Sequence, residues 1–520
     1  MVRQGASLTR EGKKIVCTLT KYPKNGFKGG KFPCLSVLLT MNFRFFFFLV
    51  FLLSACRDNT VPPPEALLPV PSSAQMEWHE MEQNAFIHFT TNTFTDLEWG
   101  FGDEDPSIFN PKDLDADQWI TTLKAAGFKA AILTCKHHDG FCLWPSAFTE
   151  HDIAASPWRN GKGDLVREVA DACRRHGLKF GVYLSPWDRN HADYGRPPYV
   201  DYYRNQLKEV FGRYGPVFEM WFDGANGGTG YYGGANEKRT IAGSTYYEWP
   251  ETLELVRGME PEVLFFSDAG PGVRWVGNER GVAGETNWNS ITPDTLFAGK
   301  PGIQELLNRG HPDGTHWIPA EVDVSIRPGW FYHVKEDSLV KSPEKLFDIY
   351  LTSVGRGSTL LLNVPPDKRG LIHEKDVASL KRWRELIDEA FKENLAADAI
   401  VEVSEYRGES PEYGPENITD GDKKTYWTTN DETTAASLEV DLGKVREIKY
   451  LLIQEYIKLG QRVSAFTVEH WQNGNWEPLV SATTIGYKRI LKFDAVQTDK
   501  LRINITRSKA CPVISNVEVY

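Results

Sequence analysis

Residues 130–139 read AAILTCKHHD, a short apolar run that ends in four polar side chains. Residues 179–188, KFGVYLSPWD, and residues 217–223, VFEMWFD, repeat this pattern. Segments with the apolar period of an amphipathic helix lie between and around these runs. Short apolar runs that alternate with amphipathic segments indicate βα units around a parallel sheet.

Seven such runs precede residue 395, and they predict a (β/α)8-like barrel with one strand irregular or missed. The runs are residues 86–89, 130–134, 179–184, 217–222, 263–267, 318–322 and 359–364. We expect helices at residues 116–126, 164–176, 202–213, 251–258, 343–354 and 374–394. Polar residues follow several runs directly, and the carboxyl ends of barrel strands meet at one mouth. The alternative is an open, doubly wound sheet, which also binds ligands at its strand ends.

The alternation stops near residue 396, and a second pattern begins at residue 401. Short runs of period two are broken by Gly, Pro, Asn and Asp, as in residues 436–440, 447–454, 466–471 and 500–506. This pattern is typical of an antiparallel β-sandwich. The sequence therefore predicts a barrel domain at residues 76–395 and a smaller all-β domain at residues 401–520.

The charge and the aromatic content narrow the class of partner. The net charge of the 520 residues is -11, whereas a protein that tracks phosphates needs an excess of Lys and Arg. We therefore exclude nucleic acid as a partner. The chain has 16 Trp and 20 Tyr, and flat rings with a polar edge suit the apolar faces of sugars.

Residues 41–56, MNFRFFFFLVFLLSAC, combine a basic residue, Arg44, with an apolar stretch too short to span a bilayer and the tetrapeptide LSAC. The pattern resembles a bacterial lipoprotein signal peptide, which would make Cys56 the lipidated first residue of the mature chain. Residues 1–40 are then an over-extended N-terminus, and the Pro- and Ser-rich residues 57–75 are a tether. We expect a cell-envelope lipoprotein, periplasmic or on the outer-membrane surface, that contacts the membrane only through this anchor.

The four remaining cysteines have no metal-binding spacing, and we expect buried thiols. They are Cys135, Cys142, Cys173 and Cys511.

Strand-end carboxylates among aromatic residues suit hydrolysis of a glycosidic bond, which needs two carboxyl groups and no cofactor. In a retaining enzyme one attacks the sugar and the other protonates the leaving oxygen. Asp223 is the best nucleophile, because an apolar strand precedes it and Gly224 leaves room for a substrate. Spacing alone does not select the proton donor among four acidic residues. These are Asp268, Glu279, Glu285 and Glu321.

Four motifs occur together: FIHF at residues 86–89, KHHDGF at 136–141, YLSPW at 183–187 and WFDG at 221–224. In this order they resemble the α-L-fucosidases of glycoside hydrolase family 29, over residues 76–395. The resemblance implies a retaining exo-α-L-fucosidase that acts on fucosylated oligosaccharides or glycoconjugates.

The resemblance also implies roles for individual residues. Asp223 corresponds to the nucleophile, and three histidines correspond to ligands of the fucose hydroxyls: His88, His137 and His138. Tyr183, Trp221 and Trp330 would line the subsite, and Glu98 and Trp99 would contact the sugar. From the residues alone, the His137–His138 pair could also be a pair of core imidazoles or a fragment of a metal site.

The phrase RWVGNERG at residues 274–281 is similar to the branch of the family that prefers α-1,3- and α-1,4-linked fucose. In that branch the closing Glu is the acid/base, which implies this role for Glu279, with Glu285 and Glu321 in reserve. Two other functions remain open. One is an inactive glycan-binding lipoprotein, and the other is an α-L-galactosidase, because L-galactose differs from L-fucose by one hydroxyl group.

In the C-terminal domain, residues 415–422, PENITDGD, and residues 425–427, TYW, resemble the discoidin-like sandwiches, which include family 32 carbohydrate-binding modules. Such modules often hold a structural Ca²⁺. Asn417, Asp420 and Asp422 supply the oxygen atoms that a hard cation prefers. The alternative is a turn rich in Asx residues without a metal.

Overall fold

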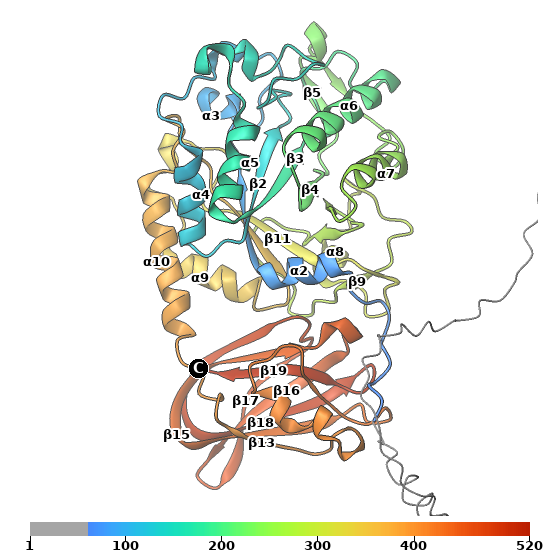
Figure 1. Cartoon of the computed structure of the whole chain (residues 1–520), viewed down its shortest axis with the longest axis vertical. Helices are drawn as coiled ribbons and strands as arrows, with labels where there is room; N and C mark the ends of the chain where they lie inside the picture. The colour runs from blue at the N-terminus through green and yellow to red at the C-terminus, as the bar shows by residue number, and fades with distance from the viewer. Residues whose placement is uncertain (1–60) are drawn as a thin grey trace, which may run out of the picture. The chain divides into compact units, whose positions relative to one another are not determined.

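The computed structural model of the chain describes residues 61–520 (Figure 1). The predictions for residues 1–40, for the signal peptide with Cys56, and for residues 57–60 lie outside the described residues. Within residues 61–520, no helix is both long enough and apolar enough to cross a membrane.

Eight parallel strands close into a barrel in the order β1-β12-β11-β8-β7-β4-β3-β2. They are β1 (Gln83–Ile87), β2 (Ala130–Lys136), β3 (Lys179–Leu184), β4 (Glu219–Trp221), β7 (Leu264–Ser267), β8 (Val273–Trp275), β11 (Ala320–Ser325) and β12 (Thr359–Asn363). The barrel prediction is confirmed, and the closed sheet excludes the doubly wound alternative. All seven predicted runs contribute to strands.

The strand that the sequence does not reveal is β8, and its connection explains why. Only residues 268–272 separate it from β7, although parallel neighbours are usually joined through a helix. With three residues and no preceding amphipathic segment, β8 lacks both signals of a βα unit.

Helices cover the outside of the barrel (Figure 1). They are α3 (Thr91–Thr95), α4 (Ala116–Ala125), α5 (Leu165–His176), α6 (Pro197–Arg213), α7 (Trp249–Met259), α8 (Gln304–Arg309), α9 (Pro343–Thr352) and α10 (Glu374–Ala390). Their ends follow local chemistry. The Asp115 side chain caps the start of α4, and α5 ends at Gly177, whose φ of 73° suits glycine.

A further helix, α2 (Ser73–Met81), precedes the first strand and begins three residues before the domain start expected at Met76. A capping box between Ser72 and Gln75 fixes its start. Before it, residues 61–72 lie along the C-terminal domain instead of hanging free as a tether. The Leu67 N–H donates to the Leu459 carbonyl at 2.9 Å, and Arg407 Nε donates to the Pro62 carbonyl at 2.7 Å.

Inward-facing side chains fill the barrel, including Trp78, Phe86, Ile132, Trp221 and Leu361. A larger apolar layer packs between the strands and the helices. The filled interior is a core and not a pore, as barrels of this size require. Because side chains fill the interior, functional side chains have room only at the strand ends.

The C-terminal domain is an antiparallel β-sandwich, as predicted. Its strands are β13 (Ile400–Val403), β14 (Trp427–Thr428), β15 (Ala436–Glu455), β16 (Val463–Gln472), β17 (Asn475–Ala482), β18 (Arg489–Ser508) and β19 (Val513–Val519). Residues such as Leu438, Phe466 and Ile503 alternate inward along these strands and form its core. Four short strands lie in barrel loops: β5 (Gly228–Gly230), β6 (Glu237–Arg239), β9 (Ser290–Ile291) and β10 (His316–Trp317).

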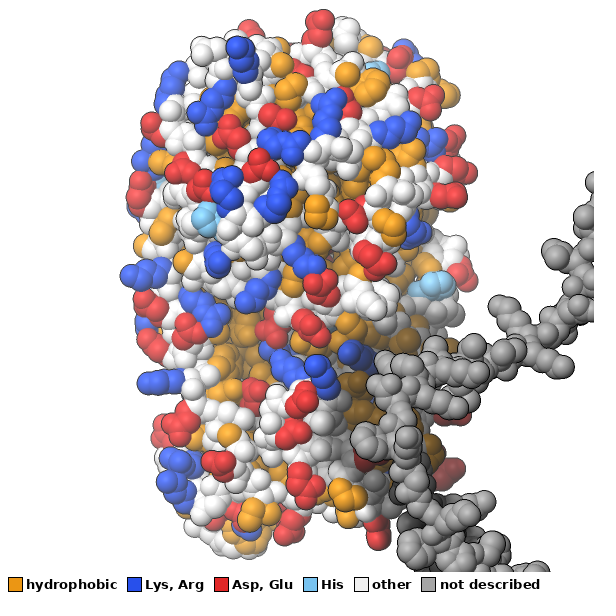
Figure 2. Space-filling model, viewed as in Figure 1, with side chains coloured by type: hydrophobic (Ala, Val, Ile, Leu, Met, Phe, Trp, Pro, Cys, Tyr) orange, Lys and Arg blue, Asp and Glu red, His pale blue; other side chains and the backbone are white. Residues whose placement is uncertain are grey.

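Acidic and basic side chains are intermixed on the face that Figure 2 shows. This distribution differs from the continuous basic surface expected of a nucleic-acid-binding protein. The four cysteines after residue 60 are buried free thiols, as predicted.

Candidate active site

A cavity of about 530 Å³ opens at the carboxyl ends of the barrel strands. It is lined by Phe86, His88, Trp99, His137, His138, Tyr183, Trp221, Asp223, Gly224, Ala225, Asp268, Trp275, Glu279, Asp323, Pro328 and Trp330. The lining includes every residue predicted for catalysis or sugar contact except Glu98. Side chains from residues 86 to 330 of the sequence therefore meet at one site.

A second cavity, of about 420 Å³, lies by the amino ends of β3 and β4. Its rim holds Glu77 and Lys179, which form an ion pair at 2.6 Å, and its wall is largely apolar. None of the predicted site residues lines it. The chemistry of this barrel therefore belongs to the first cavity.

Asp223 follows β4, and both of its carboxylate oxygens are held. Oδ2 accepts a hydrogen bond from the Tyr183 hydroxyl at 2.9 Å, and Oδ1 accepts one from the Ala225 N–H at 2.6 Å. The side chain keeps 24% of its surface exposed. Gly224 leaves room for Asp268, since a Cβ there would lie 2.4 Å from a carboxylate oxygen of Asp268 and would force that side chain to shift. Asp223 is thus a fixed, accessible carboxylate.

The histidines are buried, and hydrogen bonds assign their tautomers. The Ser185 hydroxyl donates to the Trp187 carbonyl, so it accepts from His138 Nδ1 at 2.7 Å. His88 Nδ1 likewise donates to Asn363 Oδ1 at 2.9 Å. Burial lowers the pKa of His88 to about 3 and that of His138 to about 4. Both rings are therefore neutral, with Nε2 left to accept a hydrogen bond.

His137 is also neutral, because burial and the neighbouring His138 hold its pKa well below the usual value. Its ring lies 4.0 Å from that of His138 and 5.1 Å from that of Phe331. Among the described residues, no three His, Cys, Asp or Glu side chains are placed to share a metal ion. The pair lines the cavity wall and belongs to no metal cluster within residues 61–520.

The structure separates the candidate proton donors. Glu279 lines the cavity with an exposed side chain, and partial desolvation of its carboxyl group raises its pKa, with a further rise from the charge of Asp223. Glu285 is exposed and pairs with Arg356 and Arg489 outside the cavity. Glu321 is fully buried beneath Trp221, whose indole N–H donates to it at 3.0 Å. Of the three Glu candidates, only Glu279 reaches the substrate cavity.

The closed barrel with these residues at its mouth is similar to known proteins. The family model described as alpha-L-fucosidase matches residues 66–386. The chain belongs to the α-L-fucosidase family of glycoside hydrolases. A second model, described as the F5/8 type C domain, matches residues 399–519.

Individual members of the α-L-fucosidase family align over most of the chain. Alpha-L-fucosidase 1 of Arabidopsis thaliana is 40% identical over 486 residues, which cover 92% of this chain and 93% of that protein. A glycoside hydrolase 29 family member from an unknown rumen bacterium is 45% identical, with a TM-score of 0.78, over 88% of this chain and 78% of that one. A Ruminococcus gnavus GH29 fucosidase, solved in complex with fucose, is 35% identical with a TM-score of 0.80, over 89% and 96%.

Aromatic side chains form the walls of this fucosidase-family cavity. Trp221 stacks on Phe266 with the ring centroids 3.8 Å apart, and on Tyr183 with the centroids 5.5 Å apart. Trp99 meets His138 edge-on at 5.3 Å while half of its surface stays exposed. The cavity therefore has an apolar base, formed by Trp221 on Phe266, and an aromatic edge, formed by Trp99, that faces solvent.

Two further acidic residues line the cavity: Asp268, one of the four candidate proton donors, and Asp323, which carries no predicted role. Asp268 follows β7, and its pKa rises to about 6 because it is buried, while it accepts the Gly299 N–H at 2.7 Å. Asp323 accepts the Trp275 indole N–H at 2.8 Å, and burial raises its pKa well above the usual value. The signal for Asp323 is the alternation of acidic residues along β11, where residues 321 and 323 both face inward.

Glu98 lies behind the cavity wall. Its carboxylate accepts the backbone N–H of Trp330 at 2.7 Å and that of Phe331 at 3.2 Å. It also contacts His333 at 2.6 Å. The structure thus places Glu98 against the loop that carries Trp330 and not among the cavity-lining side chains.

The residues considered for calcium form local hydrogen bonds. The Asn417 amide donates to two backbone carbonyls, and Asp420 accepts from the Asp422 N–H and the Thr425 hydroxyl. These are local contacts of the kind found in Asx-rich turns. A calcium site at Asn417, Asp420 and Asp422 stays a prediction.

Proposed function

We propose that this member of the family is a retaining α-L-fucosidase that releases terminal α-1,3- and α-1,4-linked L-fucose from glycans. Asp223 acts as the nucleophile and Glu279 as the acid/base. The observation that carries the proposal is that Asp223 and Glu279 line one cavity in contrasting environments. The first accepts hydrogen bonds on both of its carboxylate oxygens, and the second has a raised pKa because its carboxyl group is partly desolvated and lies near the charge of Asp223.

The reaction proceeds in two displacements. In the first, Asp223 bonds to the anomeric carbon while the bond to the leaving oxygen breaks, and that oxygen takes the proton of Glu279. In the second, Glu279 takes a proton from water, the water oxygen bonds to the anomeric carbon, and Asp223 leaves. A retaining pair works at a separation of about 5 to 5.5 Å. The Tyr183 hydroxyl orients Asp223 through the bond to Oδ2.

The cavity supplies matching contacts for the sugar. The neutral His88 and His138 rings present Nε2 atoms that accept hydrogen bonds from hydroxyl groups. Phe86, whose ring lies 5.1 Å from Trp221 and 6.2 Å from Trp330, supplies an apolar surface for the methyl group of a 6-deoxy sugar. A sugar that lacks one of the hydroxyls leaves a buried acceptor unpaired, which disfavours its binding.

The linkage preference rests on RWVGNERG at residues 274–281, which ends β8 and begins the loop of Glu279. The test is release of fucose by the purified protein from α-1,2-, α-1,3-, α-1,4- and α-1,6-fucosylated oligosaccharides, with an aryl fucoside and an aryl α-L-galactoside alongside. Release from the α-1,3 and α-1,4 substrates alone supports the proposal. Preference for the galactoside, or for α-1,2 or α-1,6 linkages, overturns it.

Matched variants test the two carboxyl roles. Asp223→Ala should abolish turnover, and Glu279→Gln should slow release from oligosaccharides by about 10²- to 10⁴-fold, the usual worth of general acid catalysis. Glu285→Gln is the control, because that residue lies outside the cavity. Equal losses in the Glu279 and Glu285 variants would contradict the assignment.

We further infer a lipid-anchored protein of the cell envelope, supported by the motif at residues 53–56. The full chain expressed in a bacterium should fractionate with membranes, and Cys56→Ser should release it. Membrane association that survives this substitution would refute the anchor.

A further inference from the structure

His333 lies between two carboxylates of a distant loop. Its Nδ1 is 2.7 Å from Asp96 Oδ1, and its Nε2 is 2.6 Å from Glu98 Oε1. The imidazole is buried, with 4% of its side chain exposed, whereas the two acidic side chains are about 40% exposed (45% and 38%). The contact joins segments 235 residues apart in the sequence.

Both ring nitrogens must donate in this arrangement, because a carboxylate is an acceptor only. A neutral imidazole has one N–H, so it would leave one nitrogen lone pair facing a carboxylate. The arrangement therefore selects the imidazolium. Burial alone would lower the pKa of His333, but the hydrogen bonds to Asp96 and Glu98 outweigh it and raise the pKa above the usual value.

The contact between His333 and Glu98 connects two tryptophans of the cavity. Glu98 accepts the backbone N–H of Trp330, and it directly precedes Trp99 in the chain. Trp330 and Trp99 both line the cavity, from opposite ends of the barrel sequence. The close approach needs Gly329, since a Cβ there would lie 2.5 Å from Glu98 and 3.1 Å from His333.

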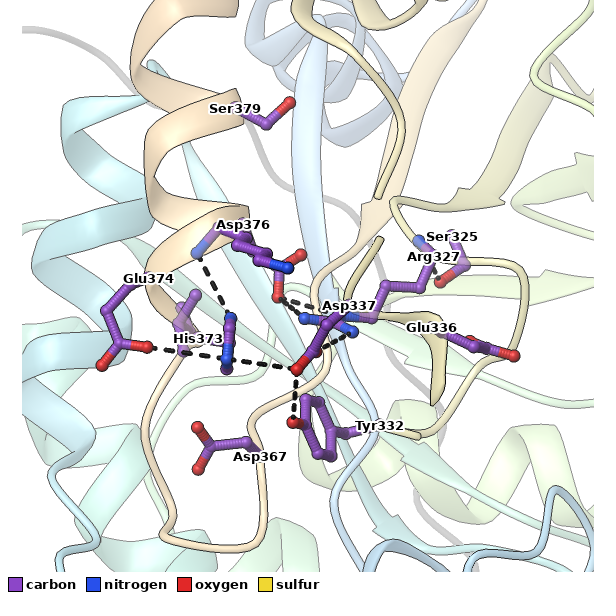
Figure 3. A network of polar contacts seen from close by, with 12 residues as sticks. Ser325, Arg327, Tyr332, Glu336, Asp337, Asp367, His373, Glu374, Asp376 and Ser379 are labelled. Atoms are coloured by element: carbon purple, nitrogen blue, oxygen red, sulfur yellow. Dashed lines mark hydrogen bonds and ion pairs between the residues drawn. The ribbon is translucent and has the colours of Figure 1, made fainter. Parts of the chain in front are cut away.

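The loop that carries His333 is fixed on its other side. Arg327 is fully buried and donates to Asp376 on α10 and to Asp337, as Figure 3 shows. The Asn363 amide donates to the Trp330 carbonyl at 2.8 Å. With that loop fixed, the contact with His333 ties the less buried loop of Glu98 and Trp99 to it, while Arg189 holds the same loop from the other side by donating to the Trp99 carbonyl at 3.2 Å.

We propose that His333 is a positioning residue for substrate binding, which as a cation locks the Glu98–Trp99 turn against the Trp330 turn and so closes the wall of the sugar cavity. This inference rests on the proposed function. His333 touches no reacting atom, and its effect on the sugar passes through Glu98, Trp99 and Trp330.

Other charged groups surround this contact. Lys335, on the same loop as His333, and Lys368, after β12, act on Asp96 and favour its ionised form. Glu336 accepts the Gly329 N–H at 3.1 Å. The lock requires a protonated His333, so it is complete below the ordinary imidazole pKa of 6.5 and is lost as the pH rises through the raised value.

The test measures the Kd of L-fucose by calorimetry, and KM and kcat for an aryl fucoside, between about pH 5 and pH 9. In the unaltered protein, Kd should rise at alkaline pH. His333→Gln should weaken L-fucose binding by about tenfold at acidic pH, the worth of one hydrogen bond to a charged group, and remove the alkaline rise. The increase should fall on KM more than on kcat.

Two further variants complete the design. His373→Gln is the matched control, because His373 also lies near two carboxylates, Asp337 and Glu374, but does not touch the Glu98 turn. Asp96→Asn changes an exposed residue without threatening the fold, and should shift the alkaline rise to lower pH, because His333 loses one anionic partner.

The outcomes are separable. A folded His333→Gln variant with unchanged Kd and pH profile, or an Asp96→Asn variant without a shift, overturns the inference and leaves the proposed function intact. An equal effect in His373→Gln would also overturn it, as a general loss of stability. If the unaltered protein neither binds L-fucose nor hydrolyses the fucoside, the proposed function fails and this inference fails with it.

Discussion

Replacing Arg327 by Met should destabilise the protein far more than an ordinary substitution. Arg327 has no exposed surface, and its Nε and Nη2 donate to Asp376 Oδ2 at 3.0 and 2.9 Å (Figure 3). Its Nη1 donates to Asp337 at 2.9 Å, and its guanidinium lies 4.7 Å from the ring centre of Tyr332. Methionine keeps the length of the side chain and removes its charge.

The magnitude follows from what is left behind. Asp376 is fully buried, and removing one partner of a buried ion pair costs about 3 to 5 kcal/mol, since the other charge stays uncompensated. Asp337 is 20% exposed and regains solvent at little cost. We therefore expect a loss of about 3 to 5 kcal/mol in the free energy of unfolding near pH 8.

The loss in the free energy of unfolding should grow as the pH rises. Burial raises the pKa of Asp376 to about 6 even though Arg327 opposes the rise, so the pKa must climb further without Arg327. The variant then keeps the carboxyl proton over a wider range, while the unfolded chain releases it near pH 3.8. Above pH 6 the gap between the two proteins should widen by about 1.4 kcal/mol per pH unit until Asp376 ionises in the variant as well.

Urea unfolding of both proteins at pH 5 and pH 8 measures this difference. The double variant Arg327→Met, Asp376→Leu removes both charges and should recover most of the loss. A single-variant loss below about 1 kcal/mol at pH 8, the scale of an exposed ion pair, would refute the reasoning. So would a double variant as unstable as the single one.

Two other predictions concern the floor of the site. Tyr183→Phe removes the hydrogen bond to Asp223 and keeps the ring, so kcat/KM should fall by about tenfold with little change in melting temperature; an unchanged kcat/KM would contradict the orienting role. Burial raises the pKa of Glu321, which shares its site with Glu219, above that of the unfolded chain, which ionises near 4.5, so stability falls as the pH rises from 4.5 through the raised value. Glu321→Gln should melt higher than the unaltered protein at pH 8 and similarly near pH 4, whereas parallel pH profiles would refute this.

The fold was predictable where local signals agree with it. The apolar runs at residues 130–134 and 179–184 match β2 and β3, and Asp115 and Gly177 mark helix ends by their own chemistry. The sequence fails at β8 because a strand of three residues, joined to its neighbour by five, has no periodicity to detect. Its place in the barrel is decided by its neighbours β7 and β11.

Some residues of the site were likewise predictable from local signals in the sequence, and others were not. Asp223 and His138 were predictable because each follows its strand directly, so position along the chain fixes position at the mouth. His333 was not, since its function depends on a partner 235 residues away. Glu279 and Glu285 are six residues apart and chemically equal in sequence, and only the arginines around Glu285 remove it from the site.

The roles proposed for Asp223 and Glu279 agree with the surroundings of the two carboxyl groups. Asp223 accepts hydrogen bonds on both oxygens and stays partly exposed, conditions that stabilise a negative charge. Partial desolvation of the Glu279 carboxyl group and the nearby charge of Asp223 both raise the pKa of Glu279. Burial lowers the pKa of His88 and of His138, so both rings are neutral and place no positive charge beside Asp223. The two carboxyl groups of this cavity therefore have different surroundings, and such an asymmetry is what a double displacement on a glycoside requires.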